Sequence, residues 1–434
     1  MKYRSTRGEH ENVDLADAIR LGAAPDGGLF LPEGIPFLGE LDGADDTPAF
    51  AERMLSPFFS GSSLADQLGP ACRRAFAPPL PIATVDEGRA NLRVLELFHG
   101  PTGAFKDFGA QFLFSLLDTI GQRGEPLTVL AATSGDTGAA VGCAAEGRLG
   151  ASAVILFPKG RVSLYQKKQI SCWGAPVRAV EVEGDFDDCQ QLVKAAFQDR
   201  SLSEQHNLTS ANSINIGRLM PQMAYLAAAA ARVFAETGEK PGFIIPTGNL
   251  GHGFAALYAR AMGLPIGPVV LVTNANPTLS EWHRSGTYEA RTSLATIANA
   301  MDVGAPSNFE RLASLGDQLG EISVERVEDD AIRARVVADY RSSGYIWCPH
   351  SATAAEAFAR LPAALQDQRP WIACATAHPY KFADVVEPLV GVSVSPTPAL
   401  AAIEHRPSRA VPMRASLEEL ARFLGTDDIQ EDAA

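Results

Sequence analysis

The segment from Glu96 to Phe112, ELFHGPTGAFKDFGAQF, is the part of the sequence that decides the fold and the chemistry. From Ala104 to Ile120, apolar residues recur at helical spacing, which predicts an amphipathic helix. On that helix Asp107 falls in a narrow polar stripe, whereas Lys106 lies on the small, apolar face. Burial lowers the pKa of a lysine and leaves its amine free for chemistry. Lys106 is therefore a candidate Schiff-base lysine.

The turn before this helix favours that interpretation. Residues 99–103, HGPTG, form a rigid turn whose two glycines let a ligand approach the backbone closely. The alternative is a first-turn lysine that extends its ammonium group to solvent, which is the usual case for helices in general. A Schiff-base lysine requires a cofactor with an aldehyde, so the rest of the chain is expected to supply anion-binding elements for it.

Bulk composition excludes several classes of partner. A chain of 434 residues with 46% hydrophobic and 20% charged residues is typical of a globular protein with two or three domains. The net charge of −14 argues against nucleic acid or an anionic membrane as a partner. We expect the partners to be limited to a small-molecule substrate. The sequence does not distinguish a monomer from a homodimer.

The six cysteines are scattered without a CxxC pair, which indicates free thiols in a reducing compartment. Cys348 and His350 have no second ligand pair nearby, so no metal is expected. The N-terminus lacks the apolar core of a signal peptide, and the most apolar helical segment, residues 223–235, is too short for a bilayer and contains Arg232. These features predict a cytoplasmic protein.

Beyond residue 90 the pattern of strand, glycine-rich turn and helix repeats. Short apolar strands alternating with helices predict an α/β fold of two αβ lobes with mainly parallel sheets and a cleft between them. The expected domains are an N-terminal packing or oligomerisation domain (1–90), a large domain (91–124 and 210–434) and a small lobe (125–209) that is expected to be mobile. The candidate strands are Leu92–Leu97, Thr128–Ala132, Ala153–Phe157, Val177–Val182, Phe243–Pro246, Val269–Thr273, Tyr345–Cys348 and Trp371–Thr376.

Two of the strands run through a glycine-rich loop into a helix. Residues 128–133 lead into SGDTG (134–138), and residues 243–247 lead into GNLGHG (248–253). Such loops point backbone N–H groups at one anion near a helix N-terminus, without a basic side chain. The run GHGFAA imitates a dinucleotide fingerprint, but no carboxylate follows the next strand until Glu281, which argues against NAD. The sequence also has no GxxxxGK[ST] loop and no GxSxG elbow.

Two further sites are ambiguous from the sequence alone. In NSINIGR (212–218), Arg218 is a candidate ligand for a phosphate or carboxylate, but Ser213 or Asn215 capping a helix beside a surface arginine explains the run equally well. Thr376 places a hydroxyl at the end of an apolar strand, where ligands collect in open α/β sheets, although a simple turn residue is the alternative.

Together these motifs resemble the threonine synthases, pyridoxal-phosphate (PLP) enzymes whose fold is shared with tryptophan synthase β chains and threonine dehydratases. The resemblance implies PLP fold type II, with the cofactor in the cleft between the lobes. It covers nearly the whole chain and is carried by YRSTRG, APDGGLFLPE, ELFHGPTGAFKDFG, ATSGDTGAA, EGDFDDCQQLVKAAF, NSINIGR, PTGNLGHG, AMDVGAPSNFERL, CPHSA and ATAHPYKF.

The resemblance also implies residue roles. Lys106 would bond to PLP, Asp136 would lie near its 3-hydroxyl, and Thr376 would face its pyridine nitrogen. The family's phosphate cradle usually continues with Phe and then Asp or Asn, and this chain departs from it with Leu250 and His252. The implied cradle residues are Gly248, Asn249, Leu250, Gly251 and His252, and the implied ligands of the substrate's phosphate and carboxylate are Thr133, Ser134, Thr137, Asn212, Ser213 and Arg218.

The implied reaction is β,γ-replacement on O-phospho-L-homoserine, which gives L-threonine and phosphate. One alternative is a related phospho-lyase that makes 2-oxobutyrate, ammonia and phosphate; the intact GNLG loop favours the synthase. A second alternative is a catalytically silent binding protein on the same fold. The presence of Lys106 and of both anion loops argues against it.

Overall fold

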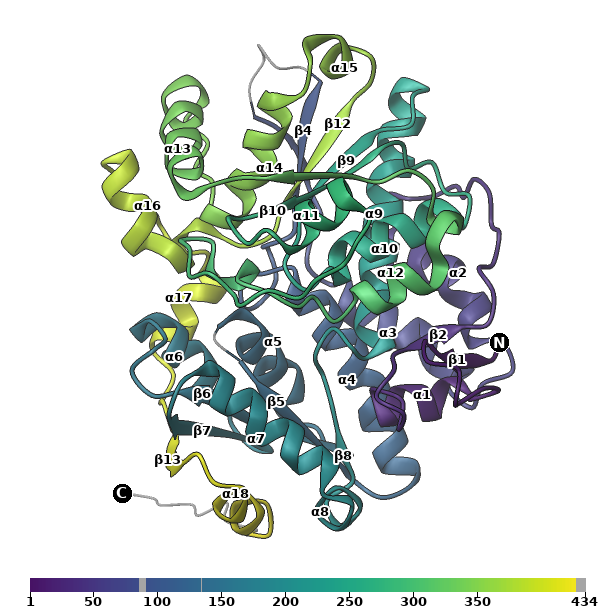
Figure 1. Ribbon diagram of the computed structural model, residues 1–434, viewed down its shortest axis with the longest axis vertical. Helices are drawn as coiled ribbons and strands as arrows, with labels where there is room; N and C mark the ends of the chain where they lie inside the picture. The colour runs from purple at the N-terminus through teal and green to yellow at the C-terminus, as the bar shows by residue number, and fades with distance from the viewer. Residues whose placement is uncertain (86–90, 134, 427–434) are drawn as a thin grey trace.

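The structure is a computed structural model that describes residues 1–85, 91–133 and 135–426. Its largest sheet has six strands, all parallel except for the antiparallel pair β3–β4. The strand order is β11 (Ser323–Arg326), β10 (Val269–Thr273), β9 (Gly242–Pro246), β12 (Trp371–Ala375), β4 (Leu92–Glu96) and β3 (Ile82–Thr84). Figure 1 shows this sheet in the upper half of the molecule.

A second sheet of five parallel strands lies at the lower left of Figure 1. Its order is β13 (Val411–Arg414), β7 (Val177–Glu183), β6 (Ala151–Pro158), β5 (Leu127–Ala132) and β8 (Leu208–Thr209). A third, antiparallel pair, β1 (Tyr3–Ser5) and β2 (Phe30–Pro32), belongs to the N-terminal region. The expected α/β class, with two mainly parallel sheets and an N-terminal domain, is confirmed.

Helices pack against both sheets. The longer ones are α2 (Thr47–Phe59), α4 (Lys106–Arg123), α5 (Asp136–Ala145), α7 (Phe186–Gln198), α9 (Ile216–Thr237), α10 (Gly251–Ala261), α13 (Asp329–Ser343) and α14 (Pro349–Arg360). The shorter ones are α1 (Leu15–Leu21), α3 (Leu68–Ala75), α6 (Leu164–Ser171), α8 (Arg200–Gln205), α11 (Thr278–Ser285), α12 (Phe309–Leu315), α15 (Ala363–Asp367), α16 (Ala383–Val390), α17 (Pro398–Glu404) and α18 (Leu417–Leu424), with 3₁₀ turns η1 (Ala65–Gln67), η3 (Asn299–Met301), η4 (Gly316–Leu319) and η5 (Pro379–Phe382).

Strand periodicity divides the interior into separate cores. Phe243 and Ile245 of β9 pack in one core with α9 and α10, while Ile244 between them packs in another core with α14. The first core continues through α4 into the small sheet, where it includes Val129 and Ile155. Helix α4 therefore joins the two sheets, and its first residue lies at their junction.

One expectation about local structure was wrong. Residues 345–348 form no strand; instead Tyr345 donates its hydroxyl to Glu96 at 2.9 Å, and Trp347 donates its indole N–H to Asp339 at 2.8 Å. Side-chain hydrogen bonds fix this apolar run without a strand ladder. Asp107, which falls in the predicted polar stripe, is buried, with 1% of its surface exposed.

The expected domain boundaries remain a proposal, and sheet membership changes them at two places. β3 pairs with β4 in the large sheet, although residues 1–90 were assigned to the N-terminal domain. β13 pairs with β7, so residues 411–424 lie with the small lobe and not with the large domain. No helix of the described residues is long and apolar enough to cross a membrane.

Candidate active site

Asp107, the residue after Lys106, holds the turn that precedes Lys106. Asp107 accepts hydrogen bonds from the backbone N–H of Thr102 at 2.9 Å and from the Thr102 hydroxyl at 2.6 Å. A Cβ at Gly100 would lie 2.4 Å from a carboxylate oxygen of Asp107, and Gly103 has a φ of 68°. The glycines of HGPTG therefore let the turn close over Asp107 and fix the start of α4.

Burial raises the pKa of Asp107 from its ordinary value of 3.8 to about 6, against the hydrogen bonds from Thr102 and the charge of Lys381, which lower it. The folded chain therefore holds the Asp107 proton more tightly than the unfolded chain. The stability from this proton is complete below about pH 4 and is lost as the pH rises through 6.

We expect the stability of the wild type, relative to Asp107→Asn, to fall by up to about 3 kcal/mol between pH 4 and pH 7. The asparagine can keep both contacts with Thr102 but carries no proton to lose. Urea unfolding of both proteins across this pH range measures the difference. A difference that does not change with pH would contradict the assignment.

Lys106 begins α4, and its side chain is 18% exposed, so a ligand can reach the amine. Its Nζ lies 3.9 Å from a carboxylate oxygen of Asp136, at the start of α5. Burial lowers the pKa of the Lys106 amine; Asp136 opposes this shift, whereas Lys381 and Arg218 add to it. The predicted partly desolvated amine is present in the structure.

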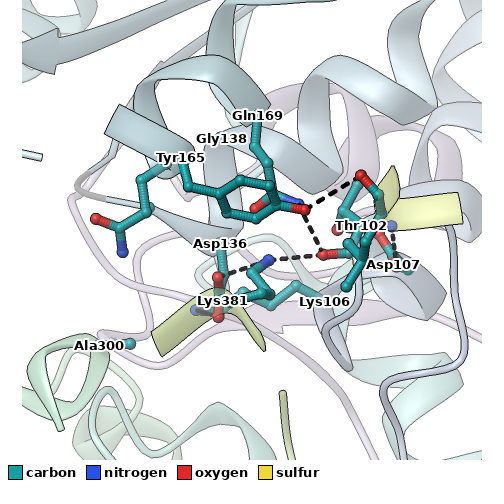
Figure 2. A network of polar contacts seen from close by, with 12 residues as sticks. Thr102, Lys106, Asp107, Asp136, Gly138, Tyr165, Gln169, Ala300 and Lys381 are labelled. Carbon is teal, nitrogen blue, oxygen red and sulfur yellow. Dashed lines mark hydrogen bonds and ion pairs between the residues drawn. The ribbon is translucent and has the colours of Figure 1, made fainter. Parts of the chain in front are cut away.

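Sequence reasoning missed a second lysine in this site. The Lys381 side chain is fully buried in η5, with its Nζ 2.8 Å from the other carboxylate oxygen of Asp136. Its ammonium also donates to the carbonyl of Thr102 at 2.7 Å. Figure 2 shows Asp136 between the two lysines. Although burial raises the pKa of Asp136, Lys381 and Lys106 lower it to about 2.

The GNLG loop runs from β9 into α10. A Cβ at Gly248 would lie 2.8 Å from Cα of Met301, so a side chain there would collide with backbone. Leu250 adopts a left-handed φ of 64°, which is strained for a residue with a side chain. The backbone N–H groups of residues 248–252 donate to no acceptor among the described residues. The loop therefore presents free donors at a helix N-terminus.

His252 packs inside this loop. Its ring stacks on Phe105 at 4.7 Å between centroids and meets Tyr225 edge-on at 5.7 Å. Burial lowers the pKa of His252 to about 3, so the ring is neutral at physiological pH. Neither ring nitrogen has a hydrogen-bond partner within the described part of the chain. His252 is thus an aromatic packing residue beneath the loop, with a spare ring N–H.

In the loop before α5, the Thr133 side chain bonds to the backbone of the same loop. The Thr133 hydroxyl accepts from the backbone N–H groups of Gly135 at 3.1 Å and Gly138 at 3.0 Å, and so caps the first turn of α5. Thr137 is partly exposed on that turn. Ser134 lies outside the described residues.

The run 212–218 is tied to the GNLG loop. Asn249 donates its amide to the hydroxyl of Ser213 at 2.8 Å, and Asn212 is partly exposed beside it. Arg218 is not a surface arginine, as the helix-cap alternative requires, because it is 4% exposed. Its guanidinium donates to the carbonyls of Ala211 at 2.7 Å and Lys106 at 3.4 Å, so it joins this run to the first turn of α4.

Thr376 lies directly after β12, against the start of α4. Its carbonyl accepts from the N–H of Phe105 at 2.9 Å, and its own N–H donates to the hydroxyl of Ser351 at 2.9 Å. The two hydroxyls of Thr376 and Ser351 are 3.5 Å apart. Ser351 is a neighbour that sequence reasoning did not identify, although it lies in the CPHSA motif.

One further buried arginine was missed. Arg311 is 0% exposed and donates to the carbonyls of Phe30 at 3.1 Å, Ser213 at 3.1 Å and Ile214, and to the side chain of Asn308. It therefore joins the N-terminal region to the loops of the site. The described residues contain no cluster of three or more His, Cys, Asp or Glu side chains suited to a metal ion.

Comparisons with known proteins match almost the whole chain. The model of the family described as "Pyridoxal-phosphate dependent enzyme" matches residues 85–376. Models of the threonine synthase N terminus and C-terminal region match residues 2–76 and 351–424.

Threonine synthase from Serratia marcescens is 37% identical over 98% of this chain and 99% of its own length. Threonine synthase from Escherichia coli is 37% identical over 90% of this chain and 91% of its own length. The crystal structure of the E. coli protein covers 98% of this chain and 99% of its own chain, with a TM-score of 0.88 at 34% identity. A PLP-bound threonine synthase from Brucella melitensis covers 98% of both chains, with a TM-score of 0.88 at 35% identity. The chain therefore belongs to the threonine synthase family of pyridoxal-phosphate-dependent enzymes.

Proposed function

We propose that this chain converts O-phospho-L-homoserine and water to L-threonine and phosphate, the last step of threonine biosynthesis. The observation that carries the proposal is the Lys106 amine, buried beside Asp136 at the junction of two sheets, in a chain that aligns with threonine synthases over almost its full length. The same family membership supports PLP as the cofactor.

The residues of the site fit PLP. Free backbone N–H groups at residues 248–252 suit its phosphate, and a Cβ at Gly248 would close that cradle against Met301. Asp136 lies beside Lys106 at the start of α5, and Thr376, at the end of β12, accepts through its carbonyl from the N–H of Phe105, the residue before Lys106. When bound, PLP supplies an aldehyde that joins to amines and withdraws electrons from the substrate Cα.

In this proposal the Lys106 amine would hold the cofactor, and it would be free to act as a base once the substrate is bound. The freed amine, with its pKa lowered by burial, takes the proton from Cα. The same amine then moves protons at Cβ and Cγ as phosphate leaves, and water adds at Cβ. The released phosphate is proposed as the base for that water.

The substrate's phosphate and carboxylate are assigned to the two loops at the site. Thr137 and Asn212 are partly exposed and suited to direct contact. Ser213 and Arg218 are engaged with Asn249 and with backbone carbonyls, so their contribution to substrate binding also includes holding the loops in place. Thr133 contributes the capped turn on which Thr137 lies.

The product of purified holoenzyme with O-phospho-L-homoserine tests the proposal. Phosphate and L-threonine in equal amounts are the expected result. Phosphate with 2-oxobutyrate and ammonia would keep the cofactor and the site but assign the chain to the phospho-lyases. No phosphate release would contradict both reactions.

We also propose a cytoplasmic location and a monomeric or homodimeric state. All six cysteines are free thiols, and the sulfurs of Cys72 and Cys374 are buried, which suits a reducing compartment. Sedimentation of the holoenzyme distinguishes monomer from dimer.

A further inference from the structure

Lys381 has no role in the reaction as described so far, yet its side chain is fully buried in the site. It follows β12 in the short helix η5, and its ammonium has two close oxygen partners, Asp136 at 2.8 Å and the Thr102 carbonyl at 2.7 Å. The Thr102 carbonyl also accepts from the amide of Gln169 at 3.2 Å. Lys381 therefore joins Asp136 to the turn from which Lys106 emerges (Figure 2).

At this site the basic side chains outnumber the carboxyl groups. Three basic side chains, Lys106, Lys381 and Arg218, meet two carboxyl groups, Asp107 and Asp136, on the elements that pack together here. If every group were ionised, one positive charge would lack a counter-charge, and such a charge is costly in a water-poor site. One of the three basic groups is therefore favoured to be neutral.

Contacts decide which of the three gives up its proton. Arg218 retains its proton, because burial lowers its pKa only to about 10. Lys381 holds Asp136 and the Thr102 carbonyl at hydrogen-bonding distances. Among the described residues, the Lys106 Nζ has the 3.9 Å approach to Asp136 and lies 5.7 Å from the centroid of the Phe105 ring. The weakest contacts belong to Lys106.

The other titratable groups that face Asp136 do not change the balance. Burial raises the pKa of the Tyr165 hydroxyl and of the Cys348 thiol, so both are uncharged at physiological pH. His350, at the start of α14, accepts from the backbone N–H of Ala300 at 3.0 Å, and burial lowers its pKa to about 4. It is neutral at physiological pH and adds no charge opposite Lys106.

We propose that Lys381 is a positioning residue for the reaction: its ammonium occupies Asp136, so that Lys106 stays an uncharged amine that can bond to PLP and take a proton. Without Lys381, Asp136 would serve Lys106 alone, and the pair would stabilise a protonated Lys106. The inference rests on the proposed role of Lys106.

Capture of PLP by Lys106 at different pH values tests the inference. Cofactor is removed from the purified full chain and added back across a pH series; the linkage is then reduced with borohydride, and the labelled peptide is quantified by mass spectrometry. In Lys381→Met the midpoint of capture is expected to rise by about one pH unit, which lowers capture at pH 7 about tenfold, because only the neutral amine reacts. Lys381→Arg keeps the charge and is expected to keep the wild-type midpoint. The acidic limb of kcat against pH should move with the capture midpoint.

If the Lys381→Met variant captured PLP with an unchanged midpoint, the inference would be overturned, and Lys381 would be a purely structural residue. The Asp136→Asn variant gives a second test, in which the midpoint is expected to move in the opposite direction. This second test is decisive in the case that the Lys381→Met variant does not fold. With the carboxylate gone, the Lys381 ammonium loses its counter-charge and disfavours a proton on Lys106 more strongly, so the midpoint is expected to fall; an unchanged midpoint would contradict the inference. If the reduced cofactor in the wild-type protein were attached to a residue other than Lys106, the proposed role of Lys106 would instead be refuted.

Discussion

Lys106→Ala is expected to lower the rate of phosphate release from O-phospho-L-homoserine by at least about 1,000-fold. A positioned general base alone contributes about 100-fold to 10,000-fold, and this variant also loses the covalent bond to the cofactor. Phosphate release by the holoenzyme and by the variant with excess PLP gives the ratio. Circular dichroism checks that the variant is folded, since the side chain removed is already 18% exposed.

Lys240→Ala is the matched control, because Lys240 is exposed and precedes β9, at the end of that strand opposite to the GNLG loop. Its rate is expected to equal that of the wild type. If Lys106→Ala kept more than about a tenth of the wild-type rate, another group would have to act as the base, and the mechanism proposed for Lys106 would be wrong.

Arg311→Met is expected to lower the free energy of unfolding by about 3–5 kcal/mol. The guanidinium is fully buried, and its removal leaves the carbonyls of Phe30, Ser213 and Ile214 without their donor. Each buried acceptor left unsatisfied costs about 1–3 kcal/mol, while the methionine recovers part of the lost packing. Urea unfolding monitored by circular dichroism measures the change.

Arg422→Met is the control for this variant, because Arg422 is 67% exposed and lies 3.7 Å from Glu418. An exposed ion pair of this kind contributes about 0–1 kcal/mol. Equal unfolding curves for the two variants would show that Arg311 does not join the N-terminal region to the site loops as its contacts indicate.

Local pattern was enough to predict much of the fold. The helix around Lys106 and most strands of both sheets carry strong apolar periodicity, and the structure has them within a few residues of the expected bounds. Strands β3, β8, β11 and β13 were not predicted, because they are short or polar and lie at sheet edges, where only one neighbour is needed. Residues 345–348 show the reverse error, since an apolar run can be held by side-chain hydrogen bonds without a ladder.

The site was predictable where its chemistry is local. The glycine loop at 248–252 and the lysine at 106 can be proposed as site residues from residue type and spacing alone. Lys381 could not be found in this way, because its contact with Thr102 spans 279 positions of sequence. The burial of Asp107 could not be predicted for a related reason: a helical wheel gives the direction of its side chain but not the turn at Thr102 that folds back over it.

The most direct test of the central claim is the position of the cofactor linkage. Borohydride reduction of the purified holoenzyme, digestion and mass spectrometry identify the modified lysine. We predict a single phosphopyridoxyl group on Lys106. A label on Lys381, which shares Asp136 with it, or no labelled lysine at all, would contradict the claim that Lys106 is the amine on which this active site is built.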